Sequence, residues 1–124
     1  MMKKLLSTAC FLSLLGAVPA VAHEGHGMAQ YGGVVAEAGM AQFEIVAKDG
    51  KVVVYATQHG APLASTGASG KLTVLEGAKK SEIELKPAGD NRLEGKGGAA
   101  AGAKLLISVQ LLGQKLLQAR AVMP

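Results

Sequence analysis

The stretch "HEGHGM", residues 23–28, gathers two imidazoles, one carboxylate and one thioether in a short glycine-containing segment. Copper(II) favours nitrogen ligands in a tetragonal array, whereas a thioether suits copper(I). If His23 is the first residue of the processed chain, its α-amine and its ring both reach one ion, and His26 adds a third nitrogen. The intervening glycines permit the tight bend that this requires. We therefore predict a copper site at His23, His26 and Met28.

The third histidine, His59 in "TQHGAP", has two interpretations. It either completes the metal site with the leader or is an ordinary surface residue of a turn, and the leader itself is also typical of a solvated tail that binds nothing specific. Zinc is the second candidate ion, but structural zinc sites use four ligands, more than this set offers. Because nitrogen ligands must be deprotonated, we expect metal affinity to fall below about pH 6.5.

This chemistry depends on where the chain is processed. Two lysines precede an almost unbroken apolar run from Leu5 to Val18, and "AVA" at residues 20–22 has the small-x-small pattern of a signal-peptidase site. The run is shorter than the roughly 20 residues that a membrane-spanning helix needs. We therefore expect residues 1–22 to be a cleaved signal peptide, and the mature protein to begin at His23 in the periplasm.

Composition limits the other classes of function. The single cysteine, Cys10, lies in the expected signal peptide, so the mature chain has no disulfide, thiolate metal site or cysteine nucleophile. The formal charge of +4 includes the two signal-peptide lysines, and only 3% of the residues are aromatic, which argues against nucleic-acid binding. No serine lies in G-x-S-x-G, and "GKGGAAAGAK" departs from the phosphate-loop pattern. We expect no enzymatic activity.

From Val34 onwards, apolar and polar residues alternate in short segments separated by turn residues, as in β-strands. Strands that recur every 8–12 residues or so are typical of an antiparallel sandwich or barrel. We predict an all-β fold, a small antiparallel immunoglobulin-like β-sandwich of about eight strands over residues 34–124. A flexible His/Gly leader is expected over residues 23–33. The clearest predicted strands are "QFEIVAK", "KVVVYAT", "KLTVLE", "SEIELK", "NRLEG", "KLLISVQLL" and "KLLQARAVM".

The alternation also assigns faces and turns. In "QFEIVAK", Phe43, Ile45 and Ala47 are expected on one face, and Gln42, Glu44 and Lys48 mostly on the other. In "SEIELK", Ile83 and Leu85 are expected to face in and Glu84 to face out. Two tight hairpin turns are expected, the first at Asp49-Gly50, where both residues tolerate a positive φ. The second is expected at residues 113–114, with the glycine first.

The last predicted hairpin is apolar on both faces. Four of its residues face one way and four the other. A sheet that is apolar on both sides suggests a second buried surface, such as a partner protein. The alternative is that strand ends simply bury a few extra leucines. The first set is Leu105, Ile107, Val109 and Leu111, and the second is Leu106, Leu112, Leu116 and Val122.

A long central segment resembles the N-terminal extra domain of periplasmic adaptor proteins of heavy-metal efflux pumps of the resistance-nodulation-division (RND) type, and small free-standing periplasmic proteins with that domain. It reads "YGGVVAEAGMAQFEIVAKDGKVVVYATQHGAPLASTGASGKLTVLEGAKKSEIELKPAGDNRLEGKG". The shared pattern is a His/Gly leader, "GGVV…G…FEIV…G…VVVY", a Pro-Leu turn and "LKPAGDNRLEG". The resemblance covers most of residues 31–122.

This resemblance implies a periplasmic β-sandwich associated with export of cobalt, zinc, cadmium or copper. His23 and His26 match the family's histidine-containing leader, whereas His59 stands in a turn where relatives often carry an acid before glycine. The chain lacks the coiled-coil hairpin, lipoyl-like and barrel segments of a full adaptor. A mature N-terminal histidine on a small β-sandwich is also similar to the periplasmic copper-resistance carriers.

Two functions are therefore expected from the sequence. The first is a periplasmic protein that binds copper, in preference to zinc, cobalt or cadmium, and buffers it or delivers it to an RND-type efflux system. The second is a non-enzymatic interaction module without a specific metal site. That module would dock on an efflux or envelope complex through a sheet edge or the last hairpin.

Overall fold

The computed structural model describes residues 28–124, so the expected signal peptide and the histidines at 23 and 26 lie outside the described residues. This part of the chain forms nine β-strands and no helix, and so contains no helix that could span a membrane. The prediction of a small antiparallel all-β domain is confirmed. The strands are β1 (Val34–Ala38), β2 (Ala41–Lys48), β3 (Lys51–Gln58), β4 (Ala61–Pro62), β5 (Ser69–Glu76), β6 (Lys79–Pro87), β7 (Arg92–Lys96), β8 (Lys104–Gln110) and β9 (Leu116–Val122).

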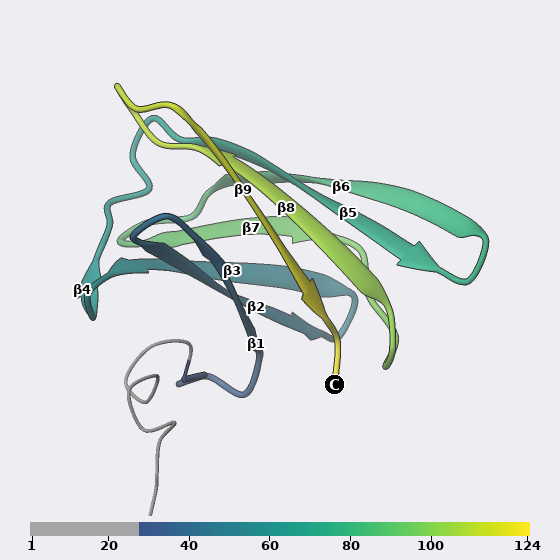
Figure 1. Cartoon of the computed structure of the whole chain (residues 1–124). Helices are drawn as coiled ribbons and strands as arrows, with labels where there is room; N and C mark the ends of the chain where they lie inside the picture. The colour runs from purple at the N-terminus through teal and green to yellow at the C-terminus, as the bar shows by residue number, and fades with distance from the viewer. Residues whose placement is uncertain (1–27) are drawn as a thin grey trace, which may run out of the picture.

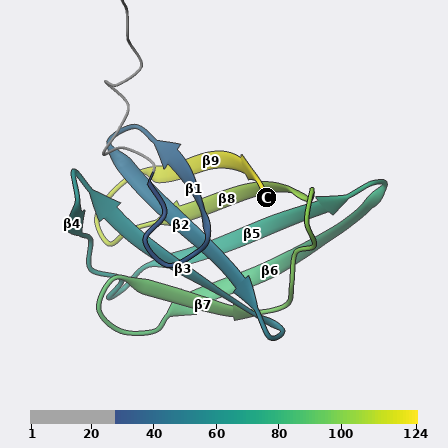
Figure 2. The same cartoon turned by 90° about the horizontal axis from the view of Figure 1, so that it is seen from below.

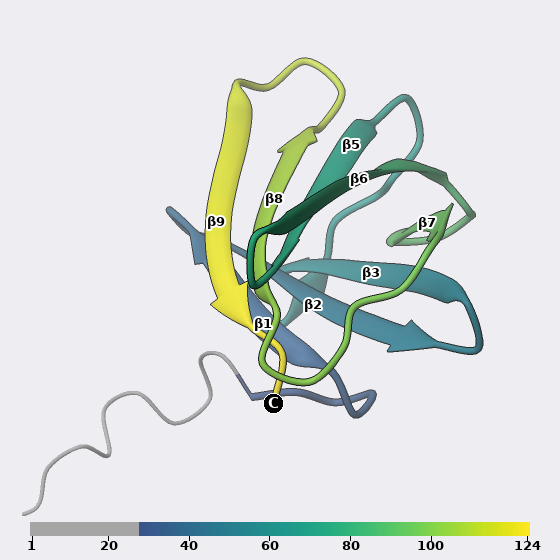
Figure 3. The same cartoon turned by 90° about the vertical axis from the view of Figure 1, so that its right-hand side faces the viewer.

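The strands form two layers that join at one side (Figure 1). Hydrogen-bonded neighbours follow the order β1-β2-β3-β7-β6-β5-β8-β9, and β4 pairs with β3. Because β1 also lies beside β9, the path almost closes into a barrel. Figure 3 shows β2 and β3 running across β8 and β9 at a steep angle, the arrangement of orthogonally packed sheets. The β5–β6 hairpin extends beyond its neighbours, as Figure 2 shows.

The core lies between the two layers and takes alternate residues from the strands. Full burial of such side chains stabilises the fold by about 1.5–3 kcal/mol each. The predicted inward faces of the long strands are confirmed, since their apolar residues are at most 5% exposed. The larger core residues are Phe43, Ile45, Val52, Val54, Leu72, Val74, Ile83, Leu85, Leu93, Leu105, Ile107, Val109 and Leu111.

One of the two predicted tight turns is confirmed. Lys48 pairs with Lys51, so the loop between β2 and β3 is Asp49-Gly50 alone. Their φ angles of 55° and 74° are the positive values of a type I′ turn. This turn fixes the register of the whole β2–β3 hairpin. Once Lys48 pairs with Lys51, each further pair is one residue back on β2 and one residue forward on β3.

The second prediction, a two-residue turn with Gly113 first, is wrong. Gln110 pairs with Leu116, which leaves a loop of residues 111–115 between β8 and β9. The N–H of Gln114 donates to the carbonyl of Leu111 over 3.0 Å, so Gly113 is the third residue of a four-residue turn. Its φ of 73° is the reason for a glycine there. The longer loop lets Leu111 bury its side chain before the chain reverses.

Candidate metal-binding region

A buried carboxylate joins the segment before β1 to the outer face of β2. Glu44 was predicted to lie on the strand face opposite Phe43 and Ile45, and on that face it is only 6% exposed. Its Oε1 accepts a hydrogen bond from the Gln30 N–H over 2.7 Å. Its Oε2 accepts from the N–H groups of Tyr31, over 2.8 Å, and of Gly33, over 2.9 Å. We call these three bonds the Glu44 clamp.

The clamp satisfies a charge that burial would otherwise penalise. Burying an ionised carboxylate is unfavourable unless hydrogen bonds compensate for its lost water. Bonds from backbone N–H groups to a carboxylate are charge-assisted and stronger than neutral ones. Glu44 therefore lies on the outward face of its strand, as the alternation requires, but the chain folds back over it and replaces the solvent.

Glycine allows this close approach of the segment to β2. A Cβ on Gly33 would overlap the carbonyl oxygen of Ile45 and lie 2.8 Å from Cγ2 of Val46. Gly32 has a φ of 80°, a left-handed conformation that glycine adopts without strain. The "YGG" of the sequence thus has two separate tasks: one glycine turns the chain and the other lets it touch the sheet.

An aromatic stack adds to the clamp. The rings of Tyr31 and Tyr55, on β3, lie 3.8 Å apart between centroids and only 12° from parallel. Such pairs contribute about 0.5–1.5 kcal/mol beyond their area burial. A flexible leader was expected as far as Gly33, yet its described end is held on the sheet at Gln30, Tyr31 and Gly33.

The clamp places Met28 close to the turn that contains His59. A hollow of about 250 Å³ is lined by Met28 and Tyr31 on one side and by Tyr55 and Gly60 on another. His59 directly precedes Gly60 in the turn between β3 and β4, is exposed, and has a φ of 52°. Met28 itself is 64% exposed. Two of the predicted site residues, Met28 and His59, therefore lie at the same end of the first layer.

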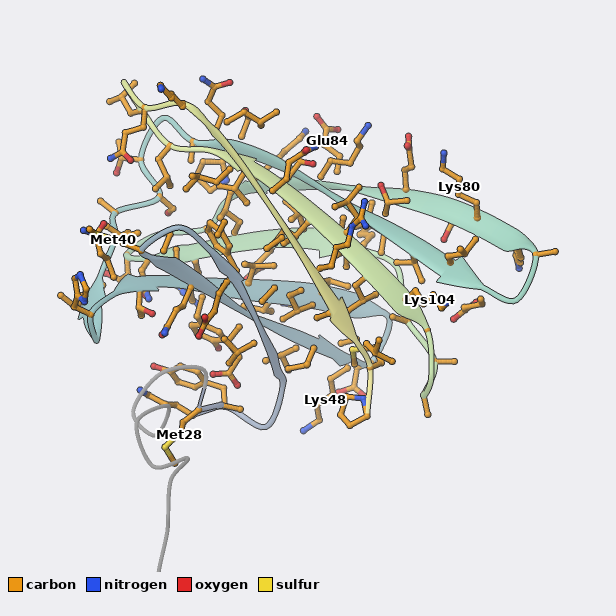
Figure 4. The ribbon with its side chains drawn as sticks, viewed as in Figure 1. Met28, Met40, Lys48, Lys80, Glu84 and Lys104 are labelled. Carbon is orange, nitrogen blue, oxygen red and sulfur yellow. The ribbon has the colours of Figure 1, made fainter. Side chains whose placement is uncertain are left out.

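A further methionine, Met40, lies at this end and was not identified from the sequence. It lies in the turn between β1 and β2 and is 65% exposed. Ala41 pairs with Gln58, so Met40 and His59 are the next residues outward on these two neighbouring strands. The Sδ of Met40 lies 3.9 Å from Nε2 of Gln58. Figure 4 shows Met40 at the turn between β1 and β2, with Met28 well below it.

The donors in this region suit a soft metal ion. No group of three or more His, Cys, Asp or Glu residues placed to hold a metal occurs within residues 28–124. The described donors are instead the imidazole of His59 and the thioethers of Met28 and Met40, all exposed. Thioethers suit copper(I), an imidazole suits copper and zinc alike, and magnesium and calcium prefer oxygen ligands. His23 and His26 lie outside the described residues.

Comparison of the chain with family models, with curated proteins and with solved structures gives no match. The resemblance to adaptor domains of RND efflux pumps thus stays a prediction from the sequence.

Proposed function

We propose that this protein binds copper in the periplasm and buffers it or passes it to a metal-export system. One observation carries the proposal: the Glu44 clamp brings Met28 to the same hollow as the turn of His59, beside Met40. Without the clamp, a leader of this length would reach many parts of a small domain. With it, the histidine segment "HEGH" is joined to Met28, which lines the same hollow as Gly60, the neighbour of His59.

Chain length supports a shared site. His26 precedes Met28 by two residues and His23 precedes it by five, so the spans are at most about 7 Å and 18 Å. These spans let both imidazoles reach the hollow that Met28 lines while the clamp stays intact. They also exclude ligands at the far ends of β5 and β6 as partners of the same ion.

The two donor types suit the two oxidation states of copper. The α-amine of a first residue His23, its ring and the ring of His26 would bind copper(II). Met28, Met40 and His59 would bind copper(I). A protein that holds either state at one end can store copper whichever state the surroundings impose. Zinc is disfavoured because thioethers are not among its usual protein ligands.

The first test is a measurement of the first residue and of bound metal together. The protein is recovered from the cell, and its intact mass is measured under gentle ionisation. A mass that begins at His23 with one copper retained is the expected result. A blocked or different first residue would remove the amine chelate and contradict the copper(II) part of the proposal.

The second test separates the described ligands. Copper(I) affinity is measured by competition with a chromophoric chelator for the natural protein and for the variants His59→Ala and Met40→Leu. Each variant is expected to bind about tenfold more weakly, which corresponds to roughly 1.4 kcal/mol. Met123→Leu, a methionine replacement near the other end of the chain, is the matched control and should leave the affinity unchanged. Binding of neither copper ion more tightly than micromolar would contradict the function.

A second candidate is the interaction module, and the last hairpin favours it. Leu112 and Leu116 are 70% and 54% exposed. The alternative that the strand ends bury these two leucines within the domain therefore does not hold for them. A chain that begins at Met28 keeps every residue of the clamp but lacks both leader histidines. The copper carrier predicts loss of copper(II) binding in this chain, whereas the module predicts partner binding equal to that of the natural protein.

A further inference from the structure

The outer face of the second layer has a hollow that the metal chemistry does not use. Its volume is about 370 Å³, and it lies over β5, β6, β8 and β9, away from the Glu44 clamp. Apolar side chains and three cations surround it. The lining residues are Thr73, Leu75, Lys80, Lys104, Leu105, Leu106 and Arg120.

Strand register explains why these residues meet. Leu75 of β5 pairs with Lys80 on one side and with Lys104 on the other, so the three side chains share one face in one row. In the next row, Leu106 pairs with Arg120. Lys104 and Arg120 are diagonal neighbours across β8 and β9, within reach of one another's long side chains. Figure 4 shows Lys80 and Lys104 on this layer.

The cations here have no acidic partner among residues 28–124. The ion pairs of this part of the chain involve Lys51, Lys71 and Arg92 instead. Lys104 and Arg120 also line an adjoining hollow of about 280 Å³, together with Val122. They therefore stand between two depressions and are open to a ligand from both.

The floor of the hollow is apolar and accessible. Leu75 is 38% exposed and Leu106 is half-buried, and Val122 of the adjoining hollow is 55% exposed. A small inorganic anion would contact the cations but leave these side chains in water, and an uncharged hydrocarbon would do the reverse. A ligand with an anionic head and an aliphatic chain satisfies both, because apolar burial and charge-assisted hydrogen bonds then act together.

We infer that this hollow binds a single-chain anionic amphiphile, with its carboxylate or similar head between Lys104 and Arg120 and its aliphatic chain over Leu75 and Leu106. Lys80 closes the far side of the hollow. A hollow of about 370 Å³ has the size of a site for one small ligand, so the proposed ligand is a monomer. This inference does not depend on copper binding.

The test is titration of the protein, recovered from the cell, with decanoate below its micelle concentration, followed by calorimetry and by amide chemical shifts. Shifts are expected at β5, β8 and β9, and lengthening the chain from octanoate to dodecanoate should strengthen binding by up to about fourfold per methylene. Decyl maltoside and decyltrimethylammonium share the chain but lack the negative head, and acetate lacks the chain. All three should bind much more weakly.

Variants then assign the two halves of the ligand. The double variant Lys104→Gln/Arg120→Gln should weaken decanoate binding at least about tenfold, while Leu106→Thr should reduce the gain per methylene. The double variant Lys48→Gln/Lys96→Gln removes two exposed cations of the other layer and is the control for net charge. Circular dichroism checks that each variant is folded. Equal binding of decyltrimethylammonium, equal binding by the double variant, or binding only to anionic vesicles or acidic peptides would each overturn the inference.

Discussion

Glu44 on β2 and Glu84 on β6 occupy similar places in strands where apolar residues alternate with polar ones, and both were expected on the face opposite the apolar residues. Glu84 is exposed as predicted (Figure 4). Glu44 is 6% exposed and accepts three backbone hydrogen bonds from a segment 11 to 14 residues earlier. The difference is in what covers each strand. The chain covers the outer face of the first layer around Glu44 with its own N-terminal residues and leaves Glu84 on the second layer open.

This contrast separates two uses of a polar residue on a strand. On the open layer, charged side chains keep the sheet soluble and form weak pairs, such as Lys71 with Glu82 at 3.4 Å and about half exposed. On the covered layer, one carboxylate determines where the N-terminal segment lies. The proposed copper site depends on the covered layer, and the proposed amphiphile site depends on the open one.

Replacing the clamp carboxylate should have the largest effect. Glu44→Ala removes the acceptor of three N–H groups, and we expect the free energy of unfolding to fall by about 3 kcal/mol. Urea denaturation measures this change. Glu84→Ala is the matched control and should change stability by no more than about 0.5 kcal/mol. If both variants lowered the free energy of unfolding equally, the hydrogen bonds to Glu44 would contribute nothing extra to stability.

Gly33→Ala should have the next largest effect. The added Cβ meets the Ile45 carbonyl, so the segment must move away from β2, and we expect a loss of about 2 kcal/mol. Gly98→Ala is the control, since a Cβ there meets nothing within 4 Å and the φ is not positive. Hydrogen exchange should also show reduced protection of the Tyr31 amide in the first variant and no change in the second.

The stack of Tyr31 on Tyr55 should contribute less to the stability of the covered layer than Glu44 or Gly33 does. A double-mutant cycle with Tyr31→Leu and Tyr55→Leu should give a coupling energy of about 1 kcal/mol, measured by thermal or urea unfolding. The stack closes the clamp over the sheet, so the coupling should disappear when the cycle is repeated in Glu44→Ala. A coupling that persists there would mean that Tyr31 stays on the sheet without the carboxylate.

The smallest effect is expected on the open layer. Leu112→Ser changes a residue that is 70% exposed in the β8–β9 loop, so stability should shift by less than about 0.5 kcal/mol. Its neighbour Leu111 is 3% exposed, and Leu111→Ser should destabilise the protein by several kcal/mol, on the order of 3. A large loss from Leu112→Ser would show that this loop supports the core instead of facing outward.

Local signals predicted the strands well because alternation and turn chemistry act over a few residues. "QFEIVAK" and "KVVVYAT" became β2 and β3, and Asp49-Gly50 became the turn between them. The turn at Gly113 was harder, because its form depends on whether Leu111 is buried first, which is a property of the core. That Met40 and His59 directly follow the outermost pair of β2 and β3 was available by counting outward from Asp49-Gly50, since a two-residue turn fixes the register.

The sequence by itself determined the all-β class, the inward faces of the strands and the residue types suited to copper. These follow from periodicity and side-chain chemistry, which are readable along the chain. Only the tertiary structure decided that Glu44 is buried, that Met28 lies by the turn of His59, and that Leu75, Lys104 and Arg120 share a hollow. Each of these facts depends on contact between segments that are distant in sequence. The free energy of such a contact depends on both surfaces, and the sequence around one segment does not say which other segment will lie against it.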